Sequence, residues 1–237
     1  MSRPGRARAP RLYFSFRSPY SWMAVTRLLR LIPDAHQRIE FVPFWDPDPV
    51  TAAALRAAGA GFHYTPMSKS KHLYILHDTR RQAAKLGLRM SWPVDDQPWW
   101  ELPHLGWLLA RRLGRAAEFY AAVVAARWER GVDVCQPPVL GRLADPLGID
   151  GDRLVAAPDQ PDLRAEGVAC LAAAYHDDIF GIPYFRVGRH RFWGLDRLDD
   201  FLAELPAGRP LGSGEPVPAG LADRVGGFDT DTAGGCG

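Results

Sequence analysis

The chain has 237 residues, and its 29 Lys and Arg against 27 Asp and Glu leave a formal net charge of +2. Hydrophobic residues make up 47% of the chain and charged residues 24%, which are ordinary values for a globular protein. The near-neutral charge argues against a nucleic-acid partner, which requires a strongly basic face. No apolar run approaches the ~20 residues that cross a bilayer, so we expect no membrane partner.

The three cysteines of the chain are odd in number and widely spaced, at Cys135, Cys170 and Cys236. This spacing predicts neither a disulfide framework nor a zinc site. His72 and His77 lack the i, i+4 spacing of a zinc pair on one helix face, so we expect no metal. The first ten residues contain no apolar core of a secretory signal. We therefore expect a reduced, cytoplasmic protein in which Cys135 and Cys170 are small buried apolar residues.

Glycine and proline are concentrated near the end of the chain. Of the 23 Gly and 21 Pro, 13 fall within residues 206–237 and 3 within residues 1–10. Such enrichment is typical of segments without a packed core. We expect a disordered basic arm at 1–10 and a disordered tail at 206–237, on either side of a folded part.

The folded part opens with a β-α-β pattern. Apolar and aromatic residues alternate over 12–16, which predicts a strand. Ser18 and Pro19 then fit the N-cap and the first position of a helix that ends before Pro33. A second strand is expected at 39–45.

The middle of the chain shows helical periodicity and no strands of its own. Gly, Pro or Asp punctuates the junctions between the expected helices, which are 50–58, 67–86, 101–113, 115–130, 138–147 and 160–177. Two strands follow at 184–187 and 190–193, and the Gly-Arg pair between them predicts a two-residue hairpin turn. A closing helix is expected at 195–205.

This order of elements predicts an α/β fold in two parts. The β-α-β half at 11–49 and the β-β-α half at 179–205 would form one domain around a shared sheet. The helical block at 50–178 has no strands to add to that sheet, so we expect it to be an insertion that packs on it.

The most informative residues lie between the first strand and the first helix, where Ser-Pro-Tyr-Ser occupies 18–21. The first turn of a helix has unpaired N–H groups and a dipole that favour negative charge. Oxidoreductases of the thioredoxin type place Cys-x-x-Cys in this context, but Ser18 and Ser21 cannot form a disulfide. Either Ser18 donates a hydrogen bond to a thiolate supplied from outside, or it only caps the helix.

Two further motifs lie near the end of the folded part. Gly-Ile-Pro-Tyr-Phe at 181–185 opens the third strand, where a proline is tolerated without any function. In Phe-Trp-Gly-Leu-Asp-Arg-Leu at 192–198, Asp196 stands at the start of the closing helix. Asp196 is either a helix cap or a carboxylate that binds a charged ligand together with helix N–H groups.

Together, the segment 13–22, the Gly-Ile-Pro motif and the Phe-Trp-Gly-Leu-Asp-Arg-Leu motif resemble 2-hydroxychromene-2-carboxylate isomerases and kappa-class glutathione transferases. The resemblance runs from about residue 11 to residue 205 and includes the helical block. It implies a DsbA-like thioredoxin fold, β-α-β and β-β-α, with a large all-helical insertion. It also implies that the protein is a homodimer.

The resemblance assigns roles to individual residues of this chain. It implies that Ser18 is catalytic and contacts the sulfur of bound glutathione. Ile182, before what would be the cis-proline Pro183, would pair through its backbone with the tripeptide. Leu195 and Asp196 would hold the γ-glutamyl end of that cofactor.

The helix expected at 67–86 matches the Lys-x-x-Tyr-x-x-x-Asp pattern of the family from Lys71 to Asp78. Upstream of that helix the family has an Asn that contacts glutathione, and here the position falls at Phe62. This difference leaves open whether the cofactor is glutathione, whether it is another low-molecular-weight thiol, or whether the substrate is handled without a thiol.

The function that the resemblance implies is isomerisation of a conjugated C=C bond in an aromatic or polyene carbonyl or carboxylate compound. A thiolate would add to the bond reversibly. We expect Tyr20, Trp45, Lys71 and Trp92 to bind this small-molecule substrate, because aromatic side chains suit a conjugated compound and Lys71 would offset developing negative charge. The alternatives are an exposed helix face for Lys71 and a place in the core for the tryptophans.

Two other functions remain open from the sequence. The first is a glutathione transferase or peroxidase of the kappa type. The second, which Phe62 favours, is a thiol-independent isomerase or an accessory binding protein in secondary metabolism. Binding of glutathione, or its failure, would separate them.

Overall fold

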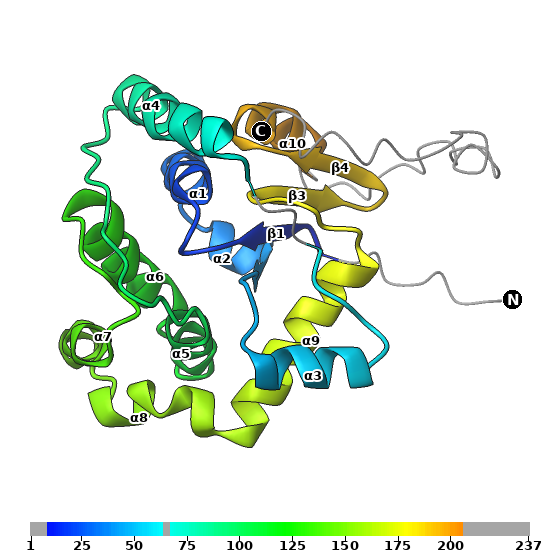
Figure 1. Ribbon diagram of the computed structural model, residues 1–237. Helices are drawn as coiled ribbons and strands as arrows, with labels where there is room; N and C mark the ends of the chain where they lie inside the picture. Colours follow the sequence, from blue (N-terminus) through cyan, green and yellow to red (C-terminus); the bar gives the residue numbers. More distant parts are fainter. Residues whose placement is uncertain (1–8, 64–66, 206–237) are drawn as a thin grey trace, which may run out of the picture.

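The computed structural model describes residues 9–63 and 67–205 of the chain, so most of the predicted arm, the predicted tail and Cys236 lie outside the described residues. Four strands form one sheet in the order β2-β1-β3-β4 (Figure 1). β1 pairs parallel with β2 and antiparallel with β3, and β3 pairs antiparallel with β4. The strands are β1 (Arg11–Phe14), β2 (Glu40–Pro43), β3 (Tyr184–Val187) and β4 (His190–Trp193).

Helices surround this sheet. In the view of Figure 1, α1, α4 and α10 lie above the sheet, α3 and α9 lie below it, and α5 to α8 are grouped at one end. Because the two halves share one sheet and the long run of helices lies between them in the chain, the predicted α/β fold with a helical insertion is confirmed. The helices are α1 (Pro19–Leu31), α2 (Ala35–Arg38), α3 (Pro49–Ala57), α4 (Lys69–Lys85), α5 (Glu101–Arg112), α6 (Ala116–Val124), α7 (Pro137–Ala144), α8 (Gly151–Val155), α9 (Pro161–His176) and α10 (Leu198–Glu204).

α1 begins as the sequence predicts. Ser18 is its N-cap, with an extended backbone and a side-chain oxygen that accepts the N–H of Ser21 at 3.1 Å. Pro19 occupies the first turn, where a missing N–H costs nothing. Trp22 and Val25 are buried, so the apolar face of the helix joins the core. The cap leaves the Ser18 hydroxyl at the junction of β1 and α1.

β1 is packed against the helical block as well as against its neighbouring strands. The Phe14 ring is fully buried and meets Trp107 of α5 and Tyr120 of α6 edge-on, with ring centroids 5.0 and 5.3 Å apart. Phe16, just beyond the strand, lies 5.5 Å from Phe14. Edge-on geometry is the one that aromatic rings prefer. One continuous core therefore joins the sheet to the insertion.

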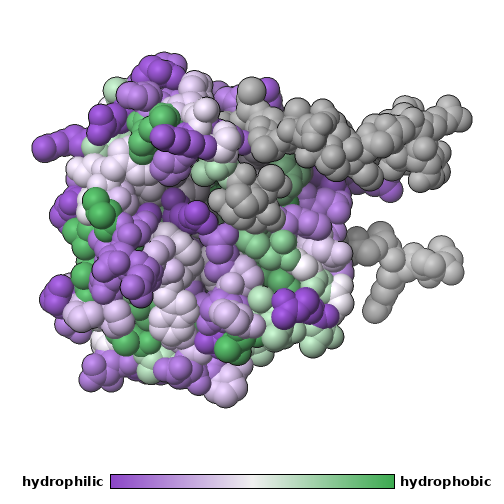
Figure 2. Space-filling model, viewed as in Figure 1, coloured by the Kyte–Doolittle hydropathy of each residue, from purple (hydrophilic) through white to green (hydrophobic). Residues whose placement is uncertain are grey.

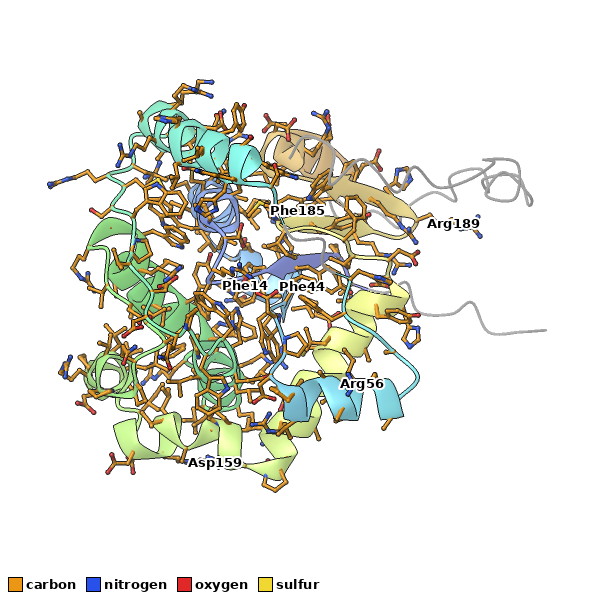
Figure 3. All side chains as sticks on the ribbon, in the orientation of Figure 1. Phe14, Phe44, Arg56, Asp159, Phe185 and Arg189 are labelled. Atoms are coloured by element: carbon orange, nitrogen blue, oxygen red, sulfur yellow. The ribbon has the colours of Figure 1, made fainter. Side chains whose placement is uncertain are left out.

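The surface of the molecule is largely polar, although a few polar residues, such as His104 and Arg127, are buried. Figure 2 shows one face that is mostly hydrophilic, with scattered hydrophobic patches. In Figure 3, Phe14, Phe44 and Phe185 lie inside the molecule, whereas Arg189 projects at its edge. Across residues 9–63 and 67–205, none of the helices has both the length and the apolar character required to cross a membrane.

Three predicted helices change their type along their length. The helix expected at 115–130 splits into α6 and a π-helical segment, Ala125–Glu129. The helix expected at 138–147 ends as α7 and continues as a 3₁₀ turn, Asp145–Leu147. The closing helix opens with a 3₁₀ turn, Leu195–Arg197, before α10. Apolar spacing over a few residues does not distinguish these helix types, because their periods differ little over one turn.

The sequence pattern does not predict α2 or α8. They span 4 and 5 residues, which is too short for a helical period to be visible. α8 nevertheless has a clear start, because the Asp150 carboxylate accepts the N–H groups of Asp152 and Arg153. β1 and β2 are shorter than predicted, whereas β3, β4 and the turn between them match the prediction.

Phe14→Ala tests whether the sheet and the helical block share one core. The substitution removes a fully buried ring from between β1, α5 and α6, so we expect a loss of about 3–5 kcal/mol in the free energy of unfolding, measured with urea. Leu31→Ala, at a side chain that is 54% exposed, is the matched control and should change stability by less than about 1 kcal/mol. Similar losses for the two variants would contradict the shared core.

Candidate active site

The turn between β1 and α1 meets the start of β3. The Ser18 hydroxyl, half-buried, donates to the backbone C=O of Ile182 at 3.4 Å while it caps α1. The peptide bond between Ile182 and Pro183 is cis. The hydroxyl therefore stands between the first turn of a helix and the backbone before a cis-proline.

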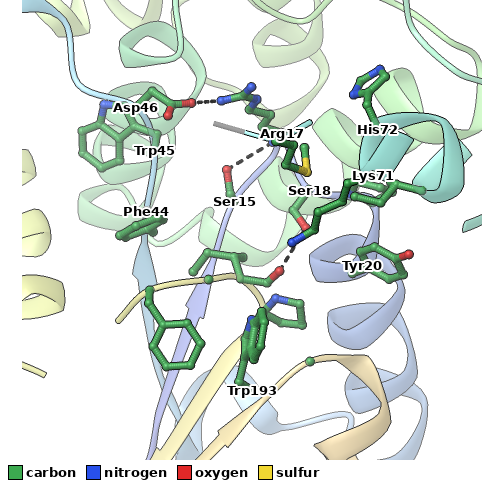
Figure 4. Close-up of a pocket in the computed structure, with 18 of the residues that line it drawn as sticks. Ser15, Arg17, Ser18, Tyr20, Phe44, Trp45, Asp46, Lys71, His72 and Trp193 are labelled. Atoms are coloured by element: carbon green, nitrogen blue, oxygen red, sulfur yellow. Dashed lines mark hydrogen bonds and ion pairs between the residues drawn. The ribbon is translucent and has the colours of Figure 1, made fainter. Parts of the chain in front are cut away.

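A cavity of about 790 Å³ opens at this junction (Figure 4). Its wall comes from the β1–α1 turn, the end of β2, the N-terminal part of α4, the chain around residues 92–95 and the segment before β3. Most of the residues predicted to form a site lie in this wall. They are Ser18, Tyr20, Trp45, Lys71, Trp92, Ile182 and Pro183.

Leu195 and Asp196, the two remaining predicted residues, are outside the wall, which in this region ends at Gly194. The Asp196 side chain is 67% exposed and pairs with its neighbour Arg197 at 2.9 Å. Asp196 does not cap the closing helix, because the N-cap of α10 is Arg197 and no side chain caps the preceding 3₁₀ turn. The capping alternative for Asp196 is therefore wrong.

The structure also distinguishes a place in the cavity wall from an exposed helix face for Lys71, and from the core for the tryptophans. Lys71 is half-buried in the cavity wall, whereas Lys69, two residues earlier, is exposed on α4. Of the tryptophans near residue 100, Trp92 lines the cavity while Trp100 and Trp107 are buried in the core. The structure thus separates one loop tryptophan from the core ones, which composition could not do.

One side of the cavity is aromatic. The rings of Phe44 and Phe62 lie 4.9 Å apart, so the position of the family's Asn is here an apolar part of the wall. Phe180 meets Trp193 edge-on at 4.7 Å, and both also line the cavity. A Cβ atom on Gly181 would lie 2.4 Å from Nε1 of Trp193, so only glycine lets the indole lie against this backbone. Sequence reasoning missed Phe180 and Trp193, although the Phe-Trp-Gly motif contains the latter.

Two ion pairs lie in the wall, and the sequence predicted neither. Arg17 of the β1–α1 turn pairs with Asp46 at the end of β2, as Figure 4 shows. Arg127 donates two hydrogen bonds to Asp95, at 2.7 and 2.8 Å. Its guanidinium also stacks between the rings of two tryptophans, Trp100 and Trp128. Because Arg127 belongs to the π-helical segment, its direction could not be read from a helical period.

Tyr20 lines the cavity, and its hydroxyl is held from outside it. The hydroxyl donates to Asp78 of α4 at 2.7 Å, and Arg81 donates to the same carboxylate at 2.9 Å. Burial, together with the Asp78 carboxylate, raises the pKa of Tyr20, so the phenol stays protonated at neutral pH. Burial alone would raise the pKa of Asp78, but the bonds from Tyr20 and Arg81 outweigh it and the pKa is lowered. Tyr20 therefore joins α1 to α4 and presents its ring to the cavity.

A buried histidine that the sequence did not point to lies behind the β1–α1 turn. Nε2 of His104 accepts the N–H of Phe16 at 3.2 Å, and Nδ1 lies 2.7 Å from the C=O of Trp100. Complete burial lowers the pKa of His104 to about 3, so the ring is neutral with its proton on Nδ1. A lone histidine in an apolar helix carries no sequence signal for this role.

The described cysteines lie away from the cavity wall. Cys135 is buried, as predicted, and Cys170 is half-buried. Burial raises the pKa of Cys135 to about 12 and that of Cys170 to about 11, so neither is a thiolate at neutral pH. Within residues 9–63 and 67–205, no three His, Cys, Asp or Glu side chains are grouped to hold a metal ion.

Comparison with known proteins agrees with this geometry. The family description that matches residues 11–206 is the DSBA-like thioredoxin domain. The chain is 30% identical over 192 residues to 2-hydroxychromene-2-carboxylate isomerase of Sphingobium xenophagum, an alignment that covers 79% of this chain and 92% of the relative. A solved structure of 2-hydroxychromene-2-carboxylate isomerase is similar with a TM-score of 0.65 at 21% identity, over 82% of this chain and 92% of the other. The cytosolic disulfide reductase DsbM of Pseudomonas aeruginosa, solved with GSH, has a TM-score of 0.53 at 18% identity, over 82% and 95% of the two chains.

The sheet order, the cis-proline and the family match together define the class, and the chain belongs to the DSBA-like thioredoxin family. Ser18 and Ser21 at the start of α1 cannot form a disulfide, so this position of the chain holds no redox dithiol. Within the class the chain belongs to the 2-hydroxychromene-2-carboxylate isomerase family, and the protein is an isomerase.

The buried pair in the cavity wall gives a stability test. Asp95→Ala leaves the Arg127 guanidinium, whose side chain is 3% exposed, without its carboxylate, and we expect a loss of about 3–5 kcal/mol in urea unfolding. Arg127→Met should cost less, because an apolar side chain then fills the space between the indole rings. Asp199→Ala removes an exposed pair with Arg27 and serves as the control, with little expected effect. Equal losses for Asp95→Ala and Asp199→Ala would contradict this account.

The neutral ring of His104 predicts a pH dependence of stability. The unfolded chain takes up a proton near pH 6.5, whereas the folded chain does so only near pH 3. The stabilisation is therefore complete above pH 6.5 and is lost as the pH falls towards 3. In His104→Gln the unfolding free energy should fall less steeply between pH 6.5 and 4.5, measured by urea unfolding at a series of pH values. Tyr120→Phe should keep the wild-type slope, and an unchanged slope in His104→Gln would refute the prediction.

Proposed function

We propose that the protein isomerises a conjugated C=C bond in an aromatic or polyene carbonyl or carboxylate compound, with a bound low-molecular-weight thiol as the nucleophile. The observation that carries this proposal is the position of Ser18. Its hydroxyl lies at the first turn of α1, in the wall of the cavity, and 3.4 Å from the backbone before a cis-proline. The relatives named 2-hydroxychromene-2-carboxylate isomerase support the same reaction class.

The residues around Ser18 fit the sulfur end of a thiol. When bound, such a thiol supplies reversible addition to a conjugated C=C bond, which permits rotation and is undone by elimination. The Ser18 hydroxyl would turn from the Ile182 C=O towards the sulfur and donate a hydrogen bond to it. The first turn of α1 would favour the negative charge on the sulfur, and so lower the thiol pKa.

The cavity offers complementary surfaces to the substrate. Trp92 and Phe180 give apolar walls for a conjugated ring or polyene, whereas Trp45 borders the cavity but is only 2% exposed. Lys71 is a compact cation in the same wall. We assign to it the stabilisation of the negative charge that develops on the carbonyl oxygen during the reaction. Tyr20 contributes its ring and not its proton, because its hydroxyl is committed to Asp78.

The identity of the thiol is a separate part of the proposal. The structure of DsbM with GSH is a precedent for glutathione in a protein of this fold. Phe62, packed against Phe44, offers no amide where the resemblance expects one, so the rest of glutathione loses a polar partner. We expect weaker binding of glutathione than of a small uncharged thiol such as 2-mercaptoethanol at equal thiolate concentration. If titration calorimetry detects no thiol at millimolar concentration while turnover persists, the thiol-independent isomerase that Phe62 favours takes its place.

Ser18→Ala tests the role of the hydroxyl. The variant keeps the helix and removes the hydrogen-bond donor to the sulfur, so we expect turnover at saturating thiol to fall about 100-fold. Ser18→Thr retains both the hydroxyl and the N-cap oxygen and should keep most of the activity. The measurement is the initial rate of alkene isomerisation, followed by absorbance of the conjugated substrate.

The control separates chemistry from helix capping. Asp150→Ala removes the N-cap of α8, which should cost about as much stability as the loss of the Ser18 cap. Asp150 and α8 do not line the cavity, so the rate should stay unchanged. If Ser18→Ala is as active as Asp150→Ala, Ser18 is only a helix cap and the proposed mechanism is wrong.

A further inference from the structure

The backbone of Phe16 is held on both sides by the inserted helical block. Its N–H donates to Nε2 of His104 in α5 at 3.2 Å. Its C=O accepts Nε1 of Trp128, from the π-helical segment, also at 3.2 Å. All three residues are fully buried, so water does not substitute for either bond and their geometry is fixed by packing.

His104 has a single arrangement available to it. Nδ1 lies 2.7 Å from the C=O of Trp100 one turn earlier, which places the ring proton there and leaves Nε2 as an acceptor. The ring stacks on Trp45, 5.1 Å away and tilted by 13°, and packs at the same distance against the ring of Phe16. These contacts aim Nε2 at the N–H of Phe16, and Nε2 also lies 3.4 Å from the hydroxyl of Ser15.

The short turn from Ser15 to Ser18 is itself tied together by hydrogen bonds. The C=O of Ser15 accepts the N–H of Ser18 at 3.2 Å, and its hydroxyl oxygen accepts the N–H of Arg17 at 3.2 Å. The N–H of Ser15 in turn donates to the hydroxyl of Ser21 in α1 at 3.1 Å. A displacement of Phe16 would therefore move Ser18 as well, because no loose residue separates them.

We propose that His104 is a positioning residue: through the N–H of Phe16 it sets where Ser18 stands at the N-terminus of α1, while Trp128 holds the C=O of the same residue. The inference rests on the proposed role of Ser18 in catalysis. His104 is not a catalytic base, because its acceptor nitrogen is occupied by Phe16 and its ring is outside the cavity wall. His104 and Trp128 both belong to the helical block, so this inserted part of the chain would position the serine turn.

The test measures the place of residue 18 without any turnover. In a chain carrying Cys236→Ser, Ser18→Cys introduces a thiol whose pKa reports the helix N-terminus, below its ordinary value of about 8.5. Burial keeps Cys135 and Cys170 protonated over this range, so thiolate absorbance at 240 nm follows the introduced thiol. Adding His104→Phe keeps a ring against Trp45 but removes the acceptor for the N–H of Phe16. We expect this change to raise the pKa of the introduced thiol by about one unit.

Three further substitutions in the same background make the result specific. His104→Gln restores an acceptor near the position of Nε2 and should recover most of the shift. Tyr120→Phe alters a residue whose ring lies 5.5 Å from that of Phe16 and whose hydroxyl makes no hydrogen bond to the backbone of Phe16, so it should leave the pKa unchanged. Trp107→Phe breaks a buried bond to the C=O of Ala116 and controls for a general loss of stability. A thiol pKa that is unchanged by His104→Phe, or that rises equally in Trp107→Phe, overturns the proposal.

Two additions keep the test decisive. If His104→Phe does not fold, Trp128→Phe removes the bond to the backbone C=O of Phe16 and should raise the thiol pKa in its place; no rise would overturn the proposal. In the chain that retains Ser18, His104→Phe should lower kcat about tenfold with less change in KM. Since the thiol titration requires no substrate, a failure of thiol-dependent isomerisation would refute the proposed function and leave the positioning result standing.

Discussion

The backbone of Phe16 is the point on which the site depends. It is the last part of the β1–α1 turn that lies inside the core, and side chains from the helical block hold both its N–H and its C=O. Beyond Phe16 the turn continues to Ser18, which lines the cavity. The cavity wall likewise combines residues of the sheet domain with Trp92 and Arg127 of the insertion. The insertion therefore completes the site, and a sheet domain without it would lack this part of the wall.

Much of the fold was predictable because its signals are local. Ser18 and Pro19 mark the start of α1, and the Gly-Arg pair marks the turn between β3 and β4. The sequence pattern did not predict the type of helix where tertiary packing determines the backbone conformation. The segment 125–129 is π-helical, and nothing in its spacing distinguishes it from the α-helix that precedes it. α2 and α8 are too short for a helical period to be visible. A side chain, Asp150, caps α8, whereas none caps α2.

The site was predictable where a motif spans it and hidden where distant segments meet. Ser18, Ile182 and Pro183 belong to motifs, and all three line the cavity. The pairs of Arg17 with Asp46 and of Arg127 with Asp95 join residues about thirty positions apart, which no spacing reveals. Leu195 and Asp196 show the converse: a motif pointed to them, but the wall ends at Gly194. His104 had no signal at all, because its role exists only once α5 is packed behind the turn.

The central claim is that the sulfur chemistry of this isomerase comes from a bound thiol and not from the chain. The most direct measurement is the rate of alkene isomerisation by dialysed protein as thiol is added, compared across glutathione, cysteine and 2-mercaptoethanol. The account predicts no turnover without thiol and a rate that saturates with thiol concentration. An equal rate with and without added thiol would contradict it.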